Sequence, residues 1–164
     1  MVKFERLDRS SAEEITVLTC FCYDAEFTLN DARDFLELPR SVAFGARDDD
    51  NKLIGYVTGS VIPESDCDPQ EFRDYGVDPN NMFCVTMLLV HEDFRRMGIA
   101  RRLMNMIFEC EVVARVEALY LHVEPDNTKA FELYQRLGFV VFKTLPDYTD
   151  DDPPRDAHLM ILKR

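Results

Sequence analysis

The residues with the clearest chemical potential lie between an apolar strand and a helix, in the segment Arg95-x-x-Gly98-x-Ala100. Gly98 can adopt backbone angles that other residues avoid, and the small Ala100 leaves room for a ligand at the helix start. The first N–H groups of a helix have no partner inside it, and together with the helix dipole they attract anions. Arg95 and Arg96 add positive charge beside them. This spacing predicts a cradle for a pyrophosphate group, although a simple strand–turn–helix junction with solvated arginines is the alternative.

The arginines of this turn contrast with the charge of the whole chain. The sequence has 19 Lys and Arg against 31 Asp and Glu, a formal net charge of −12. Nonspecific affinity for nucleic acid depends on basic residues, so this balance argues against a nucleic-acid partner and favours cations such as protonated amines. The sequence contains neither GxxxxGK[ST] nor GxGxxG. Two common phosphate loops are therefore excluded.

The elements that would position this turn alternate along a chain of 164 residues. Apolar stretches predict strands at 2–7, 41–47, 53–62, 82–90, 118–123, 139–145 and 157–162. Helical spacing predicts a helix after Ser10-Ser11 that carries Ile15, Leu18, Cys22 and Ala25, and further helices at 30–38, 99–116 and 127–137. Residues 63–80 hold six acids and one base, which predicts a surface loop with a helical turn near 71–75. The order β-α-α-β-β-β-α-β-α-β-β is typical of one mixed α/β domain over residues 1–164.

Two motifs in this order resemble the GCN5-related N-acetyltransferase (GNAT) superfamily. Arg95-x-x-Gly98-x-Ala100 is similar to the family's acetyl-CoA signature Q/R-x-x-G-x-G/A. The segment Asn127-x-x-Ala130-x-x-x-Tyr134-x-x-x-Gly138-Phe139 is similar to its N-x-x-A-x-x-[FL]-Y-x-x-x-G-F motif. The resemblance covers roughly residues 40–164. It implies an α/β fold with a mixed, splayed sheet of about six or seven strands and helices on both faces.

The resemblance also implies acetyl-CoA as co-substrate, in a gap between the strands 82–90 and 118–123. The pantetheine arm would pair with the end of the strand 82–90, and the pyrophosphate group would contact the turn that follows this strand. Asn127 would bond the pantetheine arm, and Tyr134 would face the thioester sulfur. The cofactor contacts implied in this way are Leu88, Leu89, Val90, Arg95, Arg96, Met97, Gly98, Ile99, Ala100, Arg101, Asn127 and Tyr134.

Acetyl transfer to an amine requires a neutral amine and a protonated leaving thiolate, so a general base and an acid are useful. The resemblance makes Tyr134 the candidate acid. Strand alternation puts Tyr120, His122 and Glu124 on one face, and His122 titrates near neutral pH, so it is the candidate base. Glu124 is the second choice, and a chain of waters is the third. His91, in a turn, is expected to be exposed, and His158 to be structural.

The amine acceptor has two competing interpretations. The segment Leu121-His122-Val123, Asp147-Tyr148 and the tail Arg155–Met160 resemble protein Nα-acetyltransferases. Tyr23–Gly45, the acidic loop and the strand 82–90 instead resemble arylalkylamine N-acetyltransferases, but that family's H-x-H pair falls at Cys84 and Thr86. We expect a peptide N-terminal amine. The acidic segments 63–80 and 146–156 either attract cationic amines or are simply solvated charge runs, and Tyr23, Phe27 and Tyr148 are further candidate contacts. A non-catalytic acetyl-CoA-binding domain, with Tyr134 and His122 used only for packing, is the alternative from another class.

Five cysteines, at 20, 22, 67, 84 and 110, lie mostly within apolar patterns. The odd count and the absence of a CxxC pair predict reduced, buried thiols and no metal site. This favours the cytoplasm, with the nucleus also compatible. No apolar run reaches the roughly 18–20 residues of a membrane span, so we expect no membrane partner. A homodimer is compatible with the sequence.

Overall fold

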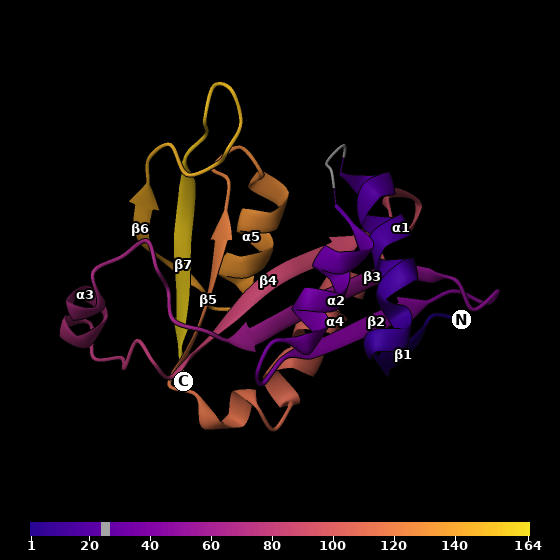
Figure 1. Cartoon of the computed structure of the whole chain (residues 1–164), viewed down its shortest axis with the longest axis horizontal. Helices are drawn as coiled ribbons and strands as arrows, with labels where there is room; N and C mark the ends of the chain where they lie inside the picture. Colours follow the sequence, from indigo (N-terminus) through magenta and orange to yellow (C-terminus); the bar gives the residue numbers. More distant parts are fainter. Residues whose placement is uncertain (24–26) are drawn as a thin grey trace. The chain divides into compact units, whose positions relative to one another are not determined.

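The computed structural model describes residues 1–23 and 27–164. The strands are β1 (Lys3–Arg6), β2 (Val42–Arg47), β3 (Leu53–Val61), β4 (Met82–Val90), β5 (Ala118–Val123), β6 (Val140–Leu145) and β7 (Ala157–Lys163). The helices are α1 (Ala12–Cys22), α2 (Leu29–Glu37), α3 (Pro69–Asp74), α4 (Ile99–Glu109) and α5 (Thr128–Arg136) (Figure 1). The strands form one mixed sheet in the order β1-β2-β3-β4-β5-β7-β6. This confirms the predicted α/β fold, and of the six or seven strands expected the sheet has seven.

The predicted strands and helices lie within one or two residues of the observed ones, with one exception. The helix predicted to run from 99 to 116 ends at Glu109, and Cys110 is extended at φ −77° and ψ 150°. Val113 continues the apolar pattern because it is buried, but it belongs to a separate 3-10 turn, Val113–Arg115. Ala25, which the helical spacing included, lies outside the described residues.

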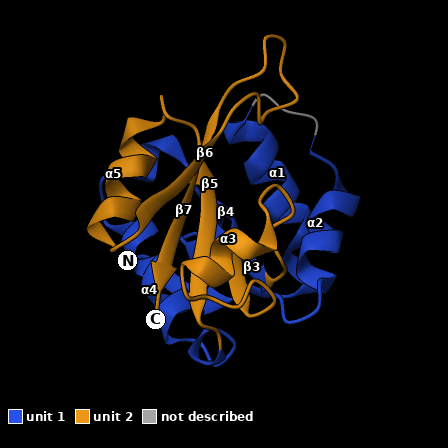
Figure 2. Cartoon of the chain, turned by 90° about the vertical axis from the view of Figure 1, so that its left-hand side faces the viewer, with its two compact units in different colours: residues 1–60, 85–115 blue, residues 61–84, 116–164 orange. Residues whose placement is uncertain are grey.

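The chain forms two compact units, residues 1–60 with 85–115 and residues 61–84 with 116–164 (Figure 2). Within the first unit, β2 pairs antiparallel with β1 and with β3. A core joins α1 and α2 to these strands and to the end of β4; its buried members are Leu7, Ala12, Ile15, Leu18, Ala32, Ala43, Leu53, Tyr56 and Leu89. Residues 53–60 of β3 are all buried, which requires cover on both faces of the sheet. Helix α4 contacts β2.

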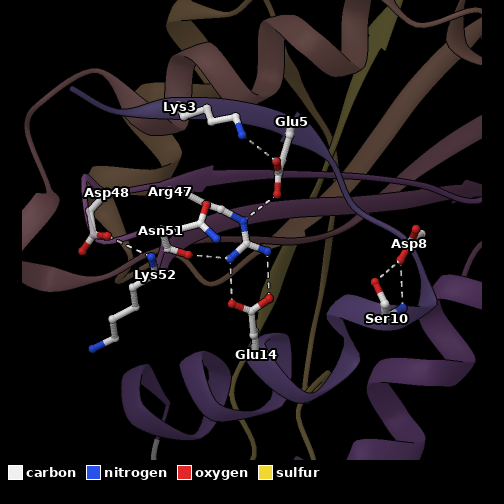
Figure 3. A network of polar contacts seen from close by, with 9 residues as sticks. All are labelled: Lys3, Glu5, Asp8, Ser10, Glu14, Arg47, Asp48, Asn51 and Lys52. Atoms are coloured by element: carbon white, nitrogen blue, oxygen red, sulfur yellow. Dashed lines mark hydrogen bonds and ion pairs between the residues drawn. The ribbon is translucent and has the colours of Figure 1, made fainter.

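A charged cluster ties β1, β2 and α1 of the first unit together (Figure 3). The Arg47 side chain, only 8% exposed, donates to both carboxylate oxygens of Glu14 at 2.6 and 2.8 Å. It also donates to Glu5 Oε1 at 2.5 Å and to the carbonyl of Asn51 at 2.9 Å. These contacts raise the pKa of Arg47 far above its ordinary value, first through Glu14 and then through Glu5. We call Glu5, Glu14, Arg47 and Asn51 the Arg47 cluster.

In the second unit, β5 lies between two neighbours. It pairs in parallel with β4 over residues 82–84 and 118–120, and antiparallel with β7 along its whole length. One face of these strands packs against Phe72 of α3, through Ala118, Tyr120, Leu159 and Ile161. On the other face, Phe131 of α5 lies 5.5 Å from the ring of His158, measured between ring centroids. Helices therefore cover both faces of this part of the sheet as well, and β5 presents alternate residues to each.

The five cysteines are free thiols, but only Cys67 and Cys84 are buried. The prediction of buried thiols is wrong for Cys20, which is exposed, and Cys22 and Cys110 are half-buried. The apolar residues of α1 do not all lie on its packed face, so the apolar pattern around Cys20 did not show that this residue is exposed. Within residues 1–23 and 27–164, none of the helices has both the length and the apolar character that crossing a membrane requires.

Candidate active site

The turn between β4 and α4 lies wholly in the first unit and is held by hydrogen bonds to both neighbouring strands. The His91 N–H donates to the carbonyl of Ile54 at 2.8 Å, and Arg95 Nε donates to the carbonyl of Val90 at 3.1 Å. Arg96 adopts a left-handed conformation, φ 67°, which is uncommon outside glycine. The sequence did not indicate this conformation, because an arginine, unlike a glycine, gives no sign of a positive φ.

Gly98 is the N-cap of α4 and lies in the left-handed region at φ 79° and ψ 2°. It provides no side-chain cap, and in the described part of the chain no atom lies within 4 Å of where its Cβ would be. Ile99 is buried and fixes the helix start, whereas the arginines 95, 96, 101 and 102 are exposed. The start of α4 is thus open beside Gly98, and exposed arginines lie close to it in the sequence, which fits the requirements of an anion site.

The strand end that precedes this turn alternates in exposure. Leu89 is buried in the core beneath α1 and α2, while Leu88 and Val90 are half-buried. Gly55 of β3 lies against it, since a Cβ there would be 3.0 Å from the Leu89 carbonyl oxygen. The positions predicted to contact the cofactor, 88–90 and 95–101, thus both lie in the first unit.

His122 lies near the end of β5 in the second unit, surrounded by residues far away in the sequence. Its Nε2 is 3.0 Å from Oε2 of Glu64, whose side chain is only 2% exposed. Its ring stacks on Tyr148, with centroids 4.6 Å apart and planes at 15°, and meets Tyr120 edge-on. The Asp66 N–H donates to Glu64 Oε1 at 2.9 Å. We call these five residues the His122 cluster.

Burial is the largest single influence on the pKa values of Glu64, Asp66 and Tyr148 in the His122 cluster. Burial raises the pKa of Glu64, but the contact with His122 and the N–H of Asp66 outweigh it, and the pKa lies below its ordinary value. Burial and the adjacent Glu64 raise the pKa of Asp66. Burial, with Glu64 next, raises the pKa of Tyr148 to about 12. Tyr148 is therefore neutral beside the imidazole at neutral pH.

Tyr134 and Asn127 lie on α5 in the second unit. Asn127 is the N-cap, and its Oδ1 accepts from the Ala130 N–H at 3.3 Å. Tyr134 is buried and meets the ring of Phe139 edge-on at 5.9 Å. The spacing of this motif thus matches a capped helix that ends at Arg136 and is followed by Gly138, which has φ 96°. The contact of Asn127 with the pantetheine arm and the role of Tyr134 as the acid remain predictions.

Glu124, the second candidate base, contacts the loop 146–156 and does not belong to the His122 cluster. Its carboxylate is ion-paired with Arg155. Arg155 also binds Asp151 at 2.6 Å, and its carbonyl accepts from the Tyr148 N–H at 2.8 Å. This pairing organises the loop that supports Tyr148.

The other two histidines lie in separate environments. His91 is stacked on Phe21 of α1 at 4.6 Å and its side chain is only 13% exposed, so its predicted exposure is wrong. The sequence could not show that α1 covers the turn. His158 Nδ1 is 2.9 Å from the hydroxyl of Thr144 in the neighbouring strand.

Sequence reasoning treated the acids of residues 63–80 as one charged loop and did not single out Glu64 or Asp66. Glu64, Asp66 and His122 each offer a ligand atom within 4.8 Å of the others, a grouping that could hold a metal ion. The prediction of no metal considered cysteine spacing alone, and it stays a prediction. No sequence signal separates Glu64 from its acidic neighbours, because its burial arises from the fold.

Comparison with known proteins defines the class of protein. The model of the acetyltransferase (GNAT) family matches residues 12–139. The chain therefore belongs to the acetyltransferase (GNAT) family, as its two motifs predicted.

Individual relatives match shorter segments. N-alpha-acetyltransferase 50 of Danio rerio is 34% identical over 68 residues, covering 41% of this chain and 40% of the relative. The chloroplastic GCN5-related N-acetyltransferase 6 of Arabidopsis thaliana is 30% identical over 90 residues, 54% of this chain and 31% of the relative. The chain thus matches less than half the length of either curated relative. The structure of Arabidopsis thaliana NAA60 in complex with acetyl-CoA superimposes with a TM-score of 0.83 at 20% identity, over 99% of this chain and 98% of that one, which confirms the fold.

Proposed function

We propose that this chain is an acetyl-CoA-dependent N-acetyltransferase that acetylates a peptide or protein N-terminal α-amine. The observation that carries the proposal is the open start of α4, where a left-handed Gly98 without a side-chain cap sits among exposed arginines in a chain of this family. Its diphosphate-binding role is supported by the chemistry of bare helix N–H groups.

Acetyl-CoA supplies an activated thioester, and the residues of this chain manage the protons around it. We assign His122 to accept a proton from the amine as its nitrogen forms the new N–C bond. Tyr134 donates a proton to the sulfur as the C–S bond breaks. A backbone N–H at the end of β4, within Leu88–Val90, stabilises the developing negative charge on the carbonyl oxygen.

The acceptor is inferred from the His122 cluster. Glu64 and Asp66 place carboxylates beside a candidate base, which favours a cationic amine, and Tyr148 adds an aromatic surface. The similarity to N-alpha-acetyltransferase 50 supports an N-terminal amine. The positions of the H-x-H pair argue against a small-amine enzyme of that type. Cys84 is buried, and the Thr86 hydroxyl lies 2.9 Å from the Thr58 hydroxyl.

A thiol-release assay tests the acceptor class directly. Acetyl-CoA should be consumed with peptides that carry free N-termini, and more slowly with N-blocked lysine peptides, aryl amines and polyamines. Preference for aryl amines would replace the proposed acceptor. Binding of acetyl-CoA without thiol release over the whole panel would instead support the non-catalytic binding domain.

A binding measurement tests the cradle independently of turnover. Gly98→Val should abolish most of the thermal stabilisation by acetyl-CoA, which is about 2.7 kcal/mol at a hundredfold excess over Kd. Gly76→Val is the matched control, because Gly76 has nearly the same backbone, φ 81°, but lies near Lys163 and outside the turn. Full stabilisation of the Gly98 variant would refute the cradle.

We propose that residues 1–164 act as one domain, because β4 contributes residues to both compact units. Five free thiols support a reducing compartment such as the cytoplasm. The acidic balance supports an amine partner and no nucleic-acid partner.

A further inference from the structure

Two buried polar atoms of the second unit face each other without a well-oriented hydrogen bond. Among the described residues, three buried side-chain atoms lack a hydrogen-bond partner of good geometry: Glu64 Oε2, His122 Nε2 and Ser60 Oγ. The separation of the first two is nevertheless 3.0 Å, the distance of an ion pair. A carboxylate removed from water is unfavourable unless it is paired, so a packing role alone does not explain Glu64.

The surroundings leave Glu64 little freedom. Its other oxygen, Oε1, is held by the Asp66 N–H at 2.9 Å. The His122 ring is held on its face by Tyr148 and at its edge by Tyr120, whose hydroxyl donates to the Ile62 carbonyl at 3.2 Å. Carboxylate and imidazole are therefore each fixed by other residues in positions where they meet.

We propose that Glu64 is the positioning residue of the candidate base: it holds His122 with a proton on Nε2 and leaves Nδ1 to accept the proton of the amine. This inference rests on the proposed function. An imidazole donates from one nitrogen and accepts at the other, and the partner of one nitrogen decides which. Because an ionised carboxylate only accepts, Nε2 must be the donor.

The proton balance of the step follows from this assignment. The amine nitrogen bonds to the acetyl carbon and its proton moves to Nδ1, directly or through one water. The imidazolium formed keeps its Nε2 proton toward Glu64, whose negative charge stabilises it. The titratable groups that face the ring are Glu64, Asp66, Tyr120 and Tyr148. Of these, only the two acids change charge near or below neutral pH, since burial holds both tyrosines protonated by raising their pKa values.

The test compares Glu64→Gln with Glu71→Gln in the full chain. The first is isosteric and removes the carboxylate. The second makes the same charge change in the same acidic segment, but Glu71 pairs with Lys143 at 2.8 Å and not with a histidine. Nitrogen-15 NMR of the imidazoles, assigned with His122→Ala, reports which ring nitrogen carries the proton. The pH profile of kcat/KM with a peptide amine is the second measurement.

We expect wild-type His122 to be protonated at Nε2 and the Glu64→Gln variant to lose this preference. The variant should also lose about tenfold in kcat/KM, and the acid limb of its profile should move to lower pH, because the imidazolium is no longer stabilised. Glu71→Gln should leave the proton on Nε2 of His122 and the position of the acid limb as they are in the wild type. A wild-type proton on Nδ1, or an unchanged acid limb in an active Glu64→Gln variant, would overturn the inference. An inactive wild type would overturn the proposed function instead, while the NMR result would still decide the pairing.

Discussion

The Arg47 cluster and the His122 cluster both withdraw charge from water, and they differ in how completely their atoms are partnered. Arg47 directs its guanidinium to two carboxylates and a backbone carbonyl, so that each of its nitrogens has an acceptor (Figure 3). Glu64 and His122 lie 3.0 Å apart with two buried atoms that make no well-formed hydrogen bond.

We interpret this difference as one between a structural role and the catalytic role proposed for His122. A fully paired buried charge fixes the chain and leaves nothing over for a ligand, as the Arg47 cluster does for β1, β2 and α1. An incompletely satisfied pair that contains a histidine retains capacity to exchange a proton. Three experiments test this distinction.

The largest effect is expected from Arg47→Met. Methionine keeps part of the apolar stem but removes every contact of the guanidinium, leaving Glu5 and Glu14 close together. We expect the free energy of unfolding to fall by about 2–4 kcal/mol in urea titrations, because the buried Arg47 side chain loses its bonds to two half-buried carboxylates and to the Asn51 carbonyl. Turnover per folded molecule should stay within about twofold of wild type. A large loss of turnover at unchanged stability would reverse the roles of the two clusters.

The second effect concerns His122→Ala. Turnover should fall by about 10²-fold, the usual scale of general base catalysis. The part of the acid limb that reports His122 should be lost, which leaves only the limb caused by protonation of the amine substrate. The matched control is His158→Ala, which removes another histidine of the second unit, one bonded to Thr144. Stability should change less than in the Arg47 variant. Equal turnover of the two histidine variants would remove His122 from the mechanism.

The smallest effect is on acid stability. The folded-state pKa of Glu64 is below its ordinary value, despite the opposing effect of burial, because of His122 and the Asp66 N–H. A lowered folded pKa gives stability that is present above the unfolded value of about 4.3 and is lost as pH falls through the folded value. The stability difference between wild type and Glu64→Gln should therefore shrink as pH falls below about 4. Chemical denaturation between pH 7 and pH 3 measures it, and a difference that is constant with pH would show that Glu64 gains nothing from its partners.

Much of the fold could be predicted because its signals are local. The apolar run of β4 and the alternation in β5 gave their bounds without error, at 82–90 and 118–123. The end of α4 was missed because Val113 is buried from a 3-10 turn, so the apolar spacing continues after the helix has stopped. The helical turn expected near 71–75 is α3, where Phe72 is fully buried.

The sequence by itself determined the two motifs, the glycine at the start of α4 and the histidine near the end of β5, because these depend on spacing within one element and its adjoining turn. Only the tertiary structure selected Glu64 from six acids in one segment and brought Tyr148 onto the ring of His122. Those contacts join residues 58 and 26 positions apart in the chain, and no local periodicity records which distant side chains a fold will bring into contact.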